Sequence, residues 1–220
     1  MPPPSASHSG QSTPGARRGR PRKGDLTSQA ILDATERLLA DRSLAEVGVE
    51  ELAAAAGISR PTFYFHFESR EAVLYALAQR TTEDLYAAAS VWLRHSDESP
   101  ADAVRRAIEA TLALWRAHGP VLRATVRARD TDPELRRFWQ EVGGRFVGSV
   151  AEQIERERAA GVALPGPPTA RALANVLVAM NEQACFNASV GRPNPAADRD
   201  LVDTLTAVWL RGVYGILPAS

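Results

Sequence analysis

Hydrogen-bonding side chains are concentrated in one short stretch of the chain. Ser59 can cap a helix that begins with Arg60 and Pro61, because its hydroxyl accepts a backbone N–H and proline loses no hydrogen bond there. Phe63 and Phe67 lie four residues apart and share the inward side of this helix. The outward side then carries Thr62, Tyr64 and His66.

These outward side chains fit the chemistry of a DNA groove. A threonine can contact a thymine methyl group or a base edge, whereas tyrosine and histidine more readily bond phosphate oxygens, which fix orientation rather than sequence. Arg60 and Arg70 add positive charge near the DNA backbone, and Ser59 and Pro61 complete the predicted DNA-binding set of this segment. A small aromatic core is the alternative interpretation, and we adopt it for Phe63 and Phe67.

Three predicted helices position this surface. The first begins at Thr27, with Asp25 or Thr27 as its candidate cap, and Thr27 is also a candidate DNA contact. The second spans 49–56 and ends at Gly57. Gly57 takes the positive φ of a tight turn, and Ile58 fills the corner before the helix at Arg60. The arrangement predicts a helix-turn-helix that lays its last helix in a major groove.

The run Gly-Ile-Ser-Arg-Pro-Thr-Phe-Tyr-Phe-His-Phe-Glu-Ser-Arg-Glu-Ala-Val-Leu, residues 57–74, resembles the signature of the TetR family of transcriptional regulators. By that resemblance, Thr62, Tyr64 and His66 contribute to the DNA-facing side. Arg70 stands where relatives commonly carry a lysine that faces a phosphate. Repression is the usual activity in this family, and the resemblance implies it here.

The first 24 residues, rich in proline, serine, glycine and arginine, predict a disordered arm. Its basic residues are Arg17, Arg18, Arg20, Arg22 and Lys23, and it contains no acidic residue. The Gly-Arg-Pro centre resembles an AT-hook, and we expect Arg18, Arg20, Arg22 and Lys23 to contact DNA, in a narrow minor groove. A generic solubilising or counterion-releasing tail is an equally open interpretation.

Helical periodicity continues through the rest of the chain, and no alternating strand pattern interrupts it. We predict an all-α fold of about nine helices, with a three-helix DNA-binding domain at 25–68 and a larger ligand-binding and dimerisation domain at 69–220. The predicted later helices are 69–95, 99–115, 121–129, 132–160, 169–189 and 196–217.

Polar and small residues at apolar positions suggest that the larger domain holds a ligand. Asn181 lies on the apolar stripe of its helix, where a carboxamide is costly unless something bonds it. Glycines at 143, 144 and 148 interrupt a long helix and can leave space. The candidate ligand-binding residues are Trp115, Trp139, Phe146, Asn181, Phe186 and Trp209. Core packing, close helix approach at the glycines and a protein partner for Asn181 are the alternatives.

Two sequence features refine the family resemblance. Met-Asn-Glu followed by Phe186, and Trp209 followed by Tyr-Gly, resemble the mycobacterial ethionamide-resistance regulator group of the TetR family. The resemblance implies a long, mostly apolar channel for a lipophilic small-molecule effector, with Asn181 as a hydrogen-bonding anchor.

Apolar residues occupy two sides of the last helix. We assign Leu201, Leu205 and Val208 to a dimer interface and the opposite side to the core. A homodimer reads two half-sites of a double-stranded operator about 34 Å apart. An effector that splays the dimer would release DNA, with coupling through the long helix that follows Ser69.

Composition and motifs argue against other classes of protein. Cys185 is the single cysteine, which excludes an internal disulfide and a multi-cysteine metal site. The four histidines are scattered and no catalytic motif is present, so we expect no enzyme, metal or cofactor. No stretch is apolar for long enough to span a bilayer, and we expect a cytoplasmic protein. The rival hypotheses are an architectural DNA-binding protein without ligand sensing and a ligand-binding bundle that has lost DNA binding.

Overall fold

The computed structural model describes residues 23–93 and 98–216, with side chains for 24–87 and 98–216. Every regular element in those ranges is helical, in agreement with the predicted fold class. Arg18, Arg20 and Arg22 of the predicted arm, and the side chain of Lys23, lie outside the described residues.

Three helices form the N-terminal unit: α1 (Lys23–Leu39), α2 (Val49–Ala55) and α3 (Arg60–His66). A short 3-10 helix, η1 (Leu44–Glu46), precedes α2 and was not predicted. Phe63 is fully buried, as predicted, and Phe67 packs at the edge of the same core. The first helix begins at Lys23, four residues before the predicted Thr27.

Six helices follow: α4 (Arg70–Leu93), α5 (Pro100–Ala117), α6 (Gly119–Ala128), α7 (Pro133–Ala159), α8 (Ala170–Ala188) and α9 (Pro195–Tyr214). Side chains of Ser99, Asp132 and Thr169 accept backbone N–H groups at the starts of α5, α7 and α8. The last helix ends at Tyr214 rather than at residue 217, because Gly215 takes a left-handed conformation with φ 69°.

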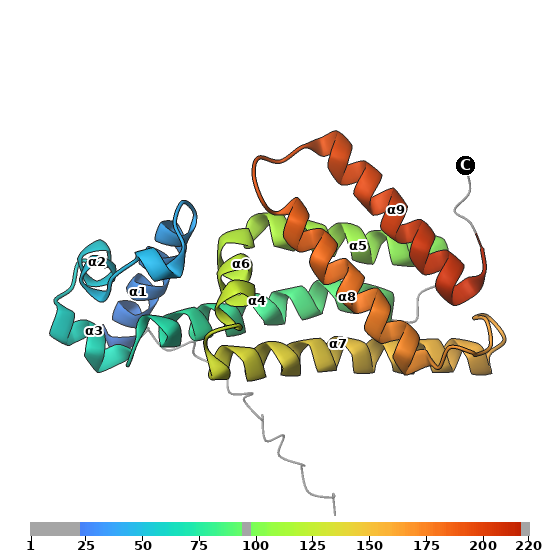
Figure 1. Cartoon of the computed structure of the whole chain (residues 1–220), viewed down its shortest axis with the longest axis horizontal. Coiled ribbons are helices and arrows are strands. Elements are labelled where there is room, and N and C mark those ends of the chain that lie inside the picture. Colours follow the sequence, from blue (N-terminus) through green and yellow to red (C-terminus); the bar gives the residue numbers. More distant parts are fainter. Residues whose placement is uncertain (1–22, 94–97, 217–220) are drawn as a thin grey trace, which may run out of the picture.

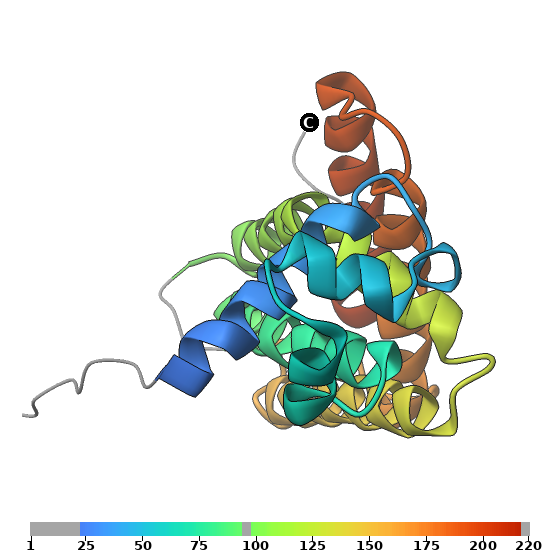
Figure 2. The ribbon, with the colours of Figure 1, turned by 90° about the vertical axis from the view of Figure 1, so that its left-hand side faces the viewer.

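The N-terminal helices lie at one end of an elongated molecule, and α4 runs from them into the larger bundle (Figure 1). Seen end-on, α2 and α3 lie in front of that bundle (Figure 2). Two clusters of buried apolar residues form the core, one in each part. The N-terminal cluster also includes Leu74 and Leu77 of α4, Val121 of α6 and Leu135 of α7. The small unit therefore completes its core with residues of the larger one.

Candidate nucleic-acid interface and ligand cavity

The outer surface of α3 is aromatic as well as polar. Ser59 Oγ accepts the Thr62 backbone N–H at 3.3 Å, so the predicted cap is present. Tyr64 is exposed, and Phe65 is 85% exposed. Phe65 was not among the predicted contacts, although it stands two residues after the buried Phe63, which places it about 200° around the helix. An apolar ring this exposed is unusual on a soluble surface and suits contact with a thymine methyl group.

The end of α3 is fastened to the start of α1. Ser28 Oγ and His66 Nδ1 are 2.9 Å apart, and the neighbouring Thr27 is half-buried. This bond orients the His66 ring from its Nδ1 side. The predicted DNA contact of Thr27 and the predicted phosphate contact of His66 stay predictions, and the structure brings both residues to the same edge of the unit.

Arg60 lies on the α3 surface and bonds its neighbours. Its guanidinium donates to Glu50 Oε1 at 2.7 Å and lies 5.7 Å from the centroid of the Tyr64 ring. Hydrogen bonding to Tyr64, and then to Glu50, raises the pKa of Arg60 above its usual value. Both members of the Arg60–Glu50 pair are exposed, so the pair contributes little to stability and can exchange for a phosphate.

Arg70 has a role inside the N-terminal unit. Its Nη1 donates to the backbone carbonyls of Leu44, Ala45 and Val47 at 3.1–3.2 Å. Its Nε donates to Glu71 Oε1 at 2.8 Å. These bonds fasten the η1 loop to the start of α4. The predicted contact between Arg70 and a phosphate stays a prediction.

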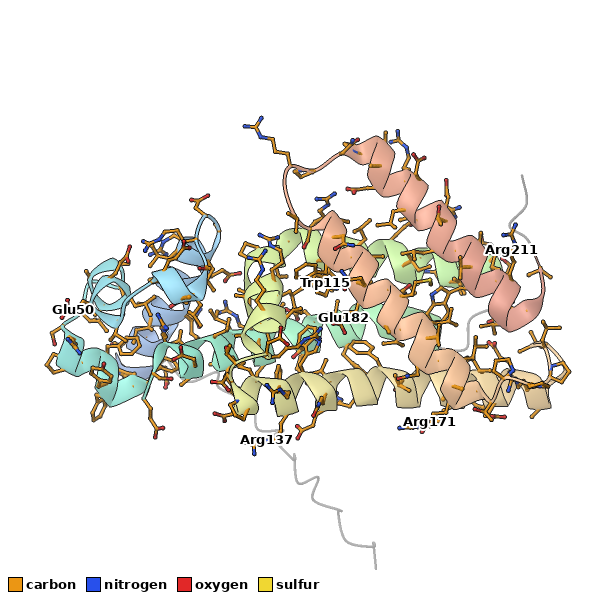
Figure 3. The ribbon with its side chains drawn as sticks, viewed as in Figure 1. Glu50, Trp115, Arg137, Arg171, Glu182 and Arg211 are labelled. Atoms are coloured by element: carbon orange, nitrogen blue, oxygen red, sulfur yellow. The ribbon has the colours of Figure 1, made fainter. Side chains whose placement is uncertain are left out.

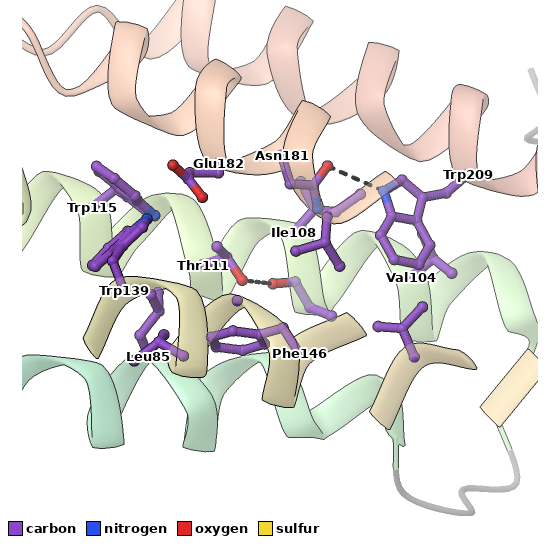
Figure 4. Close-up of a pocket in the computed structure, with 15 residues that line it drawn as sticks. Leu85, Val104, Ile108, Thr111, Trp115, Trp139, Phe146, Asn181, Glu182 and Trp209 are labelled. Atoms are coloured by element: carbon purple, nitrogen blue, oxygen red, sulfur yellow. Dashed lines mark hydrogen bonds between the residues drawn. The ribbon is translucent and has the colours of Figure 1, made fainter. Parts of the chain in front are cut away.

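Five of the six predicted ligand-binding residues line one cavity of about 100 Å³ in the larger bundle (Figure 4). They are Trp115, Trp139, Phe146, Asn181 and Trp209. Apolar residues make most of the remaining wall, among them Leu85 of α4, Val104 and Ile108 of α5, and Val178 of α8. The sixth, Phe186, is not part of the lining and supports it from outside, with its ring centroid 6.3 Å from that of Trp115.

Asn181 has a protein partner in the cavity wall. Its Oδ1 accepts the Trp209 indole N–H at 3.1 Å (Figure 4). The alternative interpretation, a bond within the protein, is therefore correct for the oxygen. No described residue accepts a hydrogen bond from Asn181 Nδ2, so this donor is available to the cavity.

The glycines of α7 do not bring helices together. Beyond its own helix backbone and chain neighbours, a Cβ placed on Gly143, Gly144 or Gly148 would meet no heavy atom of a described residue within 4 Å. Close helix approach, one of the alternatives, is therefore wrong for these positions. Gly143 lines the cavity, so at this position the missing side chain leaves space beside the cavity.

The predicted dimer residues do not share one environment. Leu205 is 4% exposed and belongs to the main core, because its side of α9 faces the bundle. Its assignment to a dimer interface stays a prediction. Leu201 is partly buried against the same core. Val208 is exposed, as is Val176 on α8. The apolar surface available to a partner is therefore shared between α8 and α9.

The described residues offer no reactive thiol, no cluster that could hold a metal ion and no helix that could span a membrane. Burial raises the pKa of the Cys185 thiol to about 12, which keeps it protonated at neutral pH. No three His, Cys, Asp or Glu side chains gather there in a way that could hold a metal ion. No helix among the described residues is long and apolar enough to cross a membrane.

Comparison with known proteins identifies the family to which the chain belongs. Residues 31–77 match the family described as bacterial regulatory proteins, tetR family, and residues 104–215 match the C-terminal domain of the transcriptional regulator EthR. The chain is 36% identical over 208 residues to the EthR regulator of Mycolicibacterium smegmatis, covering 94% of this chain and 95% of the relative. It belongs to the TetR family.

Further relatives agree with this assignment. The EthR regulator of Mycobacterium tuberculosis is 37% identical over 206 residues, covering 91% of this chain and 93% of that protein. A transcriptional regulator from Saccharomonospora viridis, solved in complex with choline, shares the fold with a TM-score of 0.70 and 20% identity, covering 84% and 96% of the two chains. The chain is thus a TetR-family transcriptional regulator of the EthR type with a helix-turn-helix DNA-binding domain.

Proposed function

We propose that this TetR-family regulator is a repressor that binds a double-stranded operator as a homodimer and leaves it when a lipophilic small molecule occupies the cavity. The observation that carries the proposal is the cavity itself, lined mainly by apolar side chains with Asn181 as one polar group. Natural ligand sites of this kind combine an apolar lining with a few polar groups that fix orientation.

The exposed side of α3 would read the major groove. Phe65 and Thr62 offer apolar contacts to thymine methyl groups, and Tyr64 offers a hydroxyl to a phosphate or a base edge. Proline at the start of α3 and the Ser59 cap fix the end of the helix that would approach DNA first. The residues outside the described ranges, Arg18, Arg20 and Arg22, would add sequence-independent attraction to the backbone.

The dimer would form through the exposed sides of α8 and α9. Val176 on α8 and Val208 on α9 supply exposed apolar area for contact with a second copy. Two copies related by a two-fold axis would place two α3 helices on half-sites one helical turn apart.

Coupling between the two parts would run through α6 in addition to α4. Val121 of α6 is fully buried in the core of the N-terminal unit. The same helix is tied to α8 by the Arg129–Glu182 ion pair, with Nη1 and Oε1 2.8 Å apart, and by a hydrogen bond from Arg123 to the Ser189 carbonyl. Because Glu182 also lines the cavity, an occupant that moves α8 would shift α6 and the core under α3.

Selection of fragments of the source genome on the full-length protein, followed by footprinting, tests the proposal. A discrete palindromic site supports a sequence-specific regulator, whereas diffuse protection of A·T-rich DNA supports the architectural alternative and overturns the proposal. Addition of lipophilic compounds to the complex then tests release. A complex that no cavity-binding compound releases would contradict the effector role.

A further inference from the structure

A groove between α7 and α8 shares a wall with the interior cavity. The groove has a volume of about 710 Å³. Residues that line both spaces are Trp139, Gly143, Val178 and Glu182. Glu182 lies midway along α8, and Arg171 lies near the end of α8 that crosses α7 (Figure 3). The same residues therefore form the wall that separates the two spaces.

The two glycines at this wall are not explained by packing within the protein. Gly143 faces both spaces and Gly144 faces the groove, and a Cβ on either would meet no heavy atom of another described element within 4 Å. A glycine inside a helix costs about 0.5–1 kcal/mol relative to alanine. Because they lack side chains, these two consecutive glycines of α7 leave the groove open.

A buried donor in the same wall has no acceptor in the part of the chain that the structure describes. Trp139 is 6% exposed, and among the described residues no acceptor lies within hydrogen-bond distance of its Nε1. Its ring meets Trp115 edge-on, with the centroids 6.4 Å apart. A buried N–H without an acceptor is costly, so an oxygen atom delivered to this wall would be favoured.

We infer that a small amphiphile enters sideways between α7 and α8. Its apolar chain fills the cavity, an accepting oxygen of its head group bonds Trp139 Nε1, and the rest of the head group lies in the groove. This inference rests on the effector role proposed above and names the class of effector.

The charges of the groove restrict the head group to a neutral or anionic one. Glu182 is already paired with Arg129, with Nη1 and Oε1 2.8 Å apart. Arg171 is exposed and lies at ion-pair distance from no carboxylate of the described residues. A cationic head group would offer no acceptor to Trp139 and would meet Arg171.

Calorimetric titration of the full-length protein with octanamide, octanoate and octylammonium tests the head group, because each of the three has a straight chain of eight carbons. Octanamide and octanoate should bind, and octylammonium should bind at least about tenfold more weakly. Trp139→Phe keeps an aromatic ring and removes the N–H, so it should weaken octanamide binding by about threefold to tenfold. Its thermal unfolding midpoint, measured in parallel, verifies that the variant is folded.

Stopped-flow tryptophan fluorescence tests the route. Gly143→Leu should slow octanamide association, whereas Gly148→Leu, on the same helix but lining neither space, should not. Gly143→Ala provides a milder variant if the leucine does not fold. The inference would be overturned by equal affinity for the three compounds, or by no binding of any of them. It would also be overturned by unchanged octanamide affinity in Trp139→Phe, or by equal association rates in the two glycine variants. Operator binding without ligand is a separate measurement, and its absence would instead overturn the proposed function.

Discussion

Arg129, the residue that caps the end of α6, pairs with Glu182 in the wall of the cavity, with 2.8 Å between Nη1 and Oε1. This ion pair gives the two parts of the protein a polar link in addition to their shared apolar core. Because both side chains are about one-third exposed, the ion pair contributes little to the free energy of unfolding. Its contribution to coupling between the two parts can be measured by mutation.

Arg129→Gln should uncouple the ligand site from DNA. We expect operator affinity without ligand to stay within about twofold, while the concentration of a releasing compound needed for half-release rises by about fivefold or more. Fluorescence anisotropy of a labelled operator measures both quantities. Arg127→Gln, an exposed arginine on the same helix, is the matched control. Equal behaviour of the two variants would remove α6 from the coupling scheme.

Phe65→Ala should weaken operator binding without affecting folding. An exposed ring contributes little to stability, so the free energy of unfolding should change by less than about 0.5 kcal/mol. Loss of its contacts with DNA should reduce affinity roughly tenfold. Gel shifts and urea unfolding give the two values. Phe63→Ala, in contrast, should destabilise by about 3–5 kcal/mol because that ring is fully buried. Unchanged DNA affinity in Phe65→Ala would place this ring outside the DNA interface.

Asn181→Leu should alter the response to ligand more than the affinity for DNA. The change removes the hydrogen bond from Trp209, which costs about 0.5–1.5 kcal/mol of stability, and removes Nδ2 as a donor to the cavity. A double-mutant cycle with Trp209→Phe isolates the pair in thermal unfolding. Parallel loss of operator binding and of ligand response in Asn181→Leu would show that the amide only supports the fold.

Gly144→Ala and Gly215→Ala should have opposite effects on stability. Alanine at 144 meets open space in the middle of α7 and should stabilise the protein by about 0.5–1 kcal/mol. Alanine at 215 would be strained at φ 69° and its Cβ would lie 3.0 Å from Leu164 Cδ1, so the protein should be destabilised. Scanning calorimetry resolves the two shifts, and a lower unfolding midpoint for Gly144→Ala would show that the groove does not have this space.

Local signals in the sequence were enough to predict the helices and much of the cavity. Ser99, Asp132 and Thr169 are caps whose hydrogen bonds form within a few residues, so the helix starts could be predicted without tertiary information. Trp139, Asn181 and Trp209 could be predicted as lining residues because they share apolar helix faces that the bundle must bury.

Features that depend on neighbouring elements could not be predicted in this way. Leu205 and Val208 are both apolar, and only the packing of α9 on α5 and α8 decides which one is buried. The exposed Phe65 follows from helix geometry, although its hydrophobic character favours a core interpretation. The groove beside Gly143 requires the position of α8 relative to α7, which no periodicity gives.

Residues Leu74, Leu77, Val121 and Leu135 complete the core beneath α3 although they come from three helices of the larger bundle. A fragment cut at residue 68 would expose the apolar undersides of its own helices to water and should not fold unaided. Chimaeras that exchange N-terminal units between relatives must therefore also carry the start of α4 and the contacting residues of α6 and α7. Otherwise the transferred unit will pack against apolar side chains that do not complement its own.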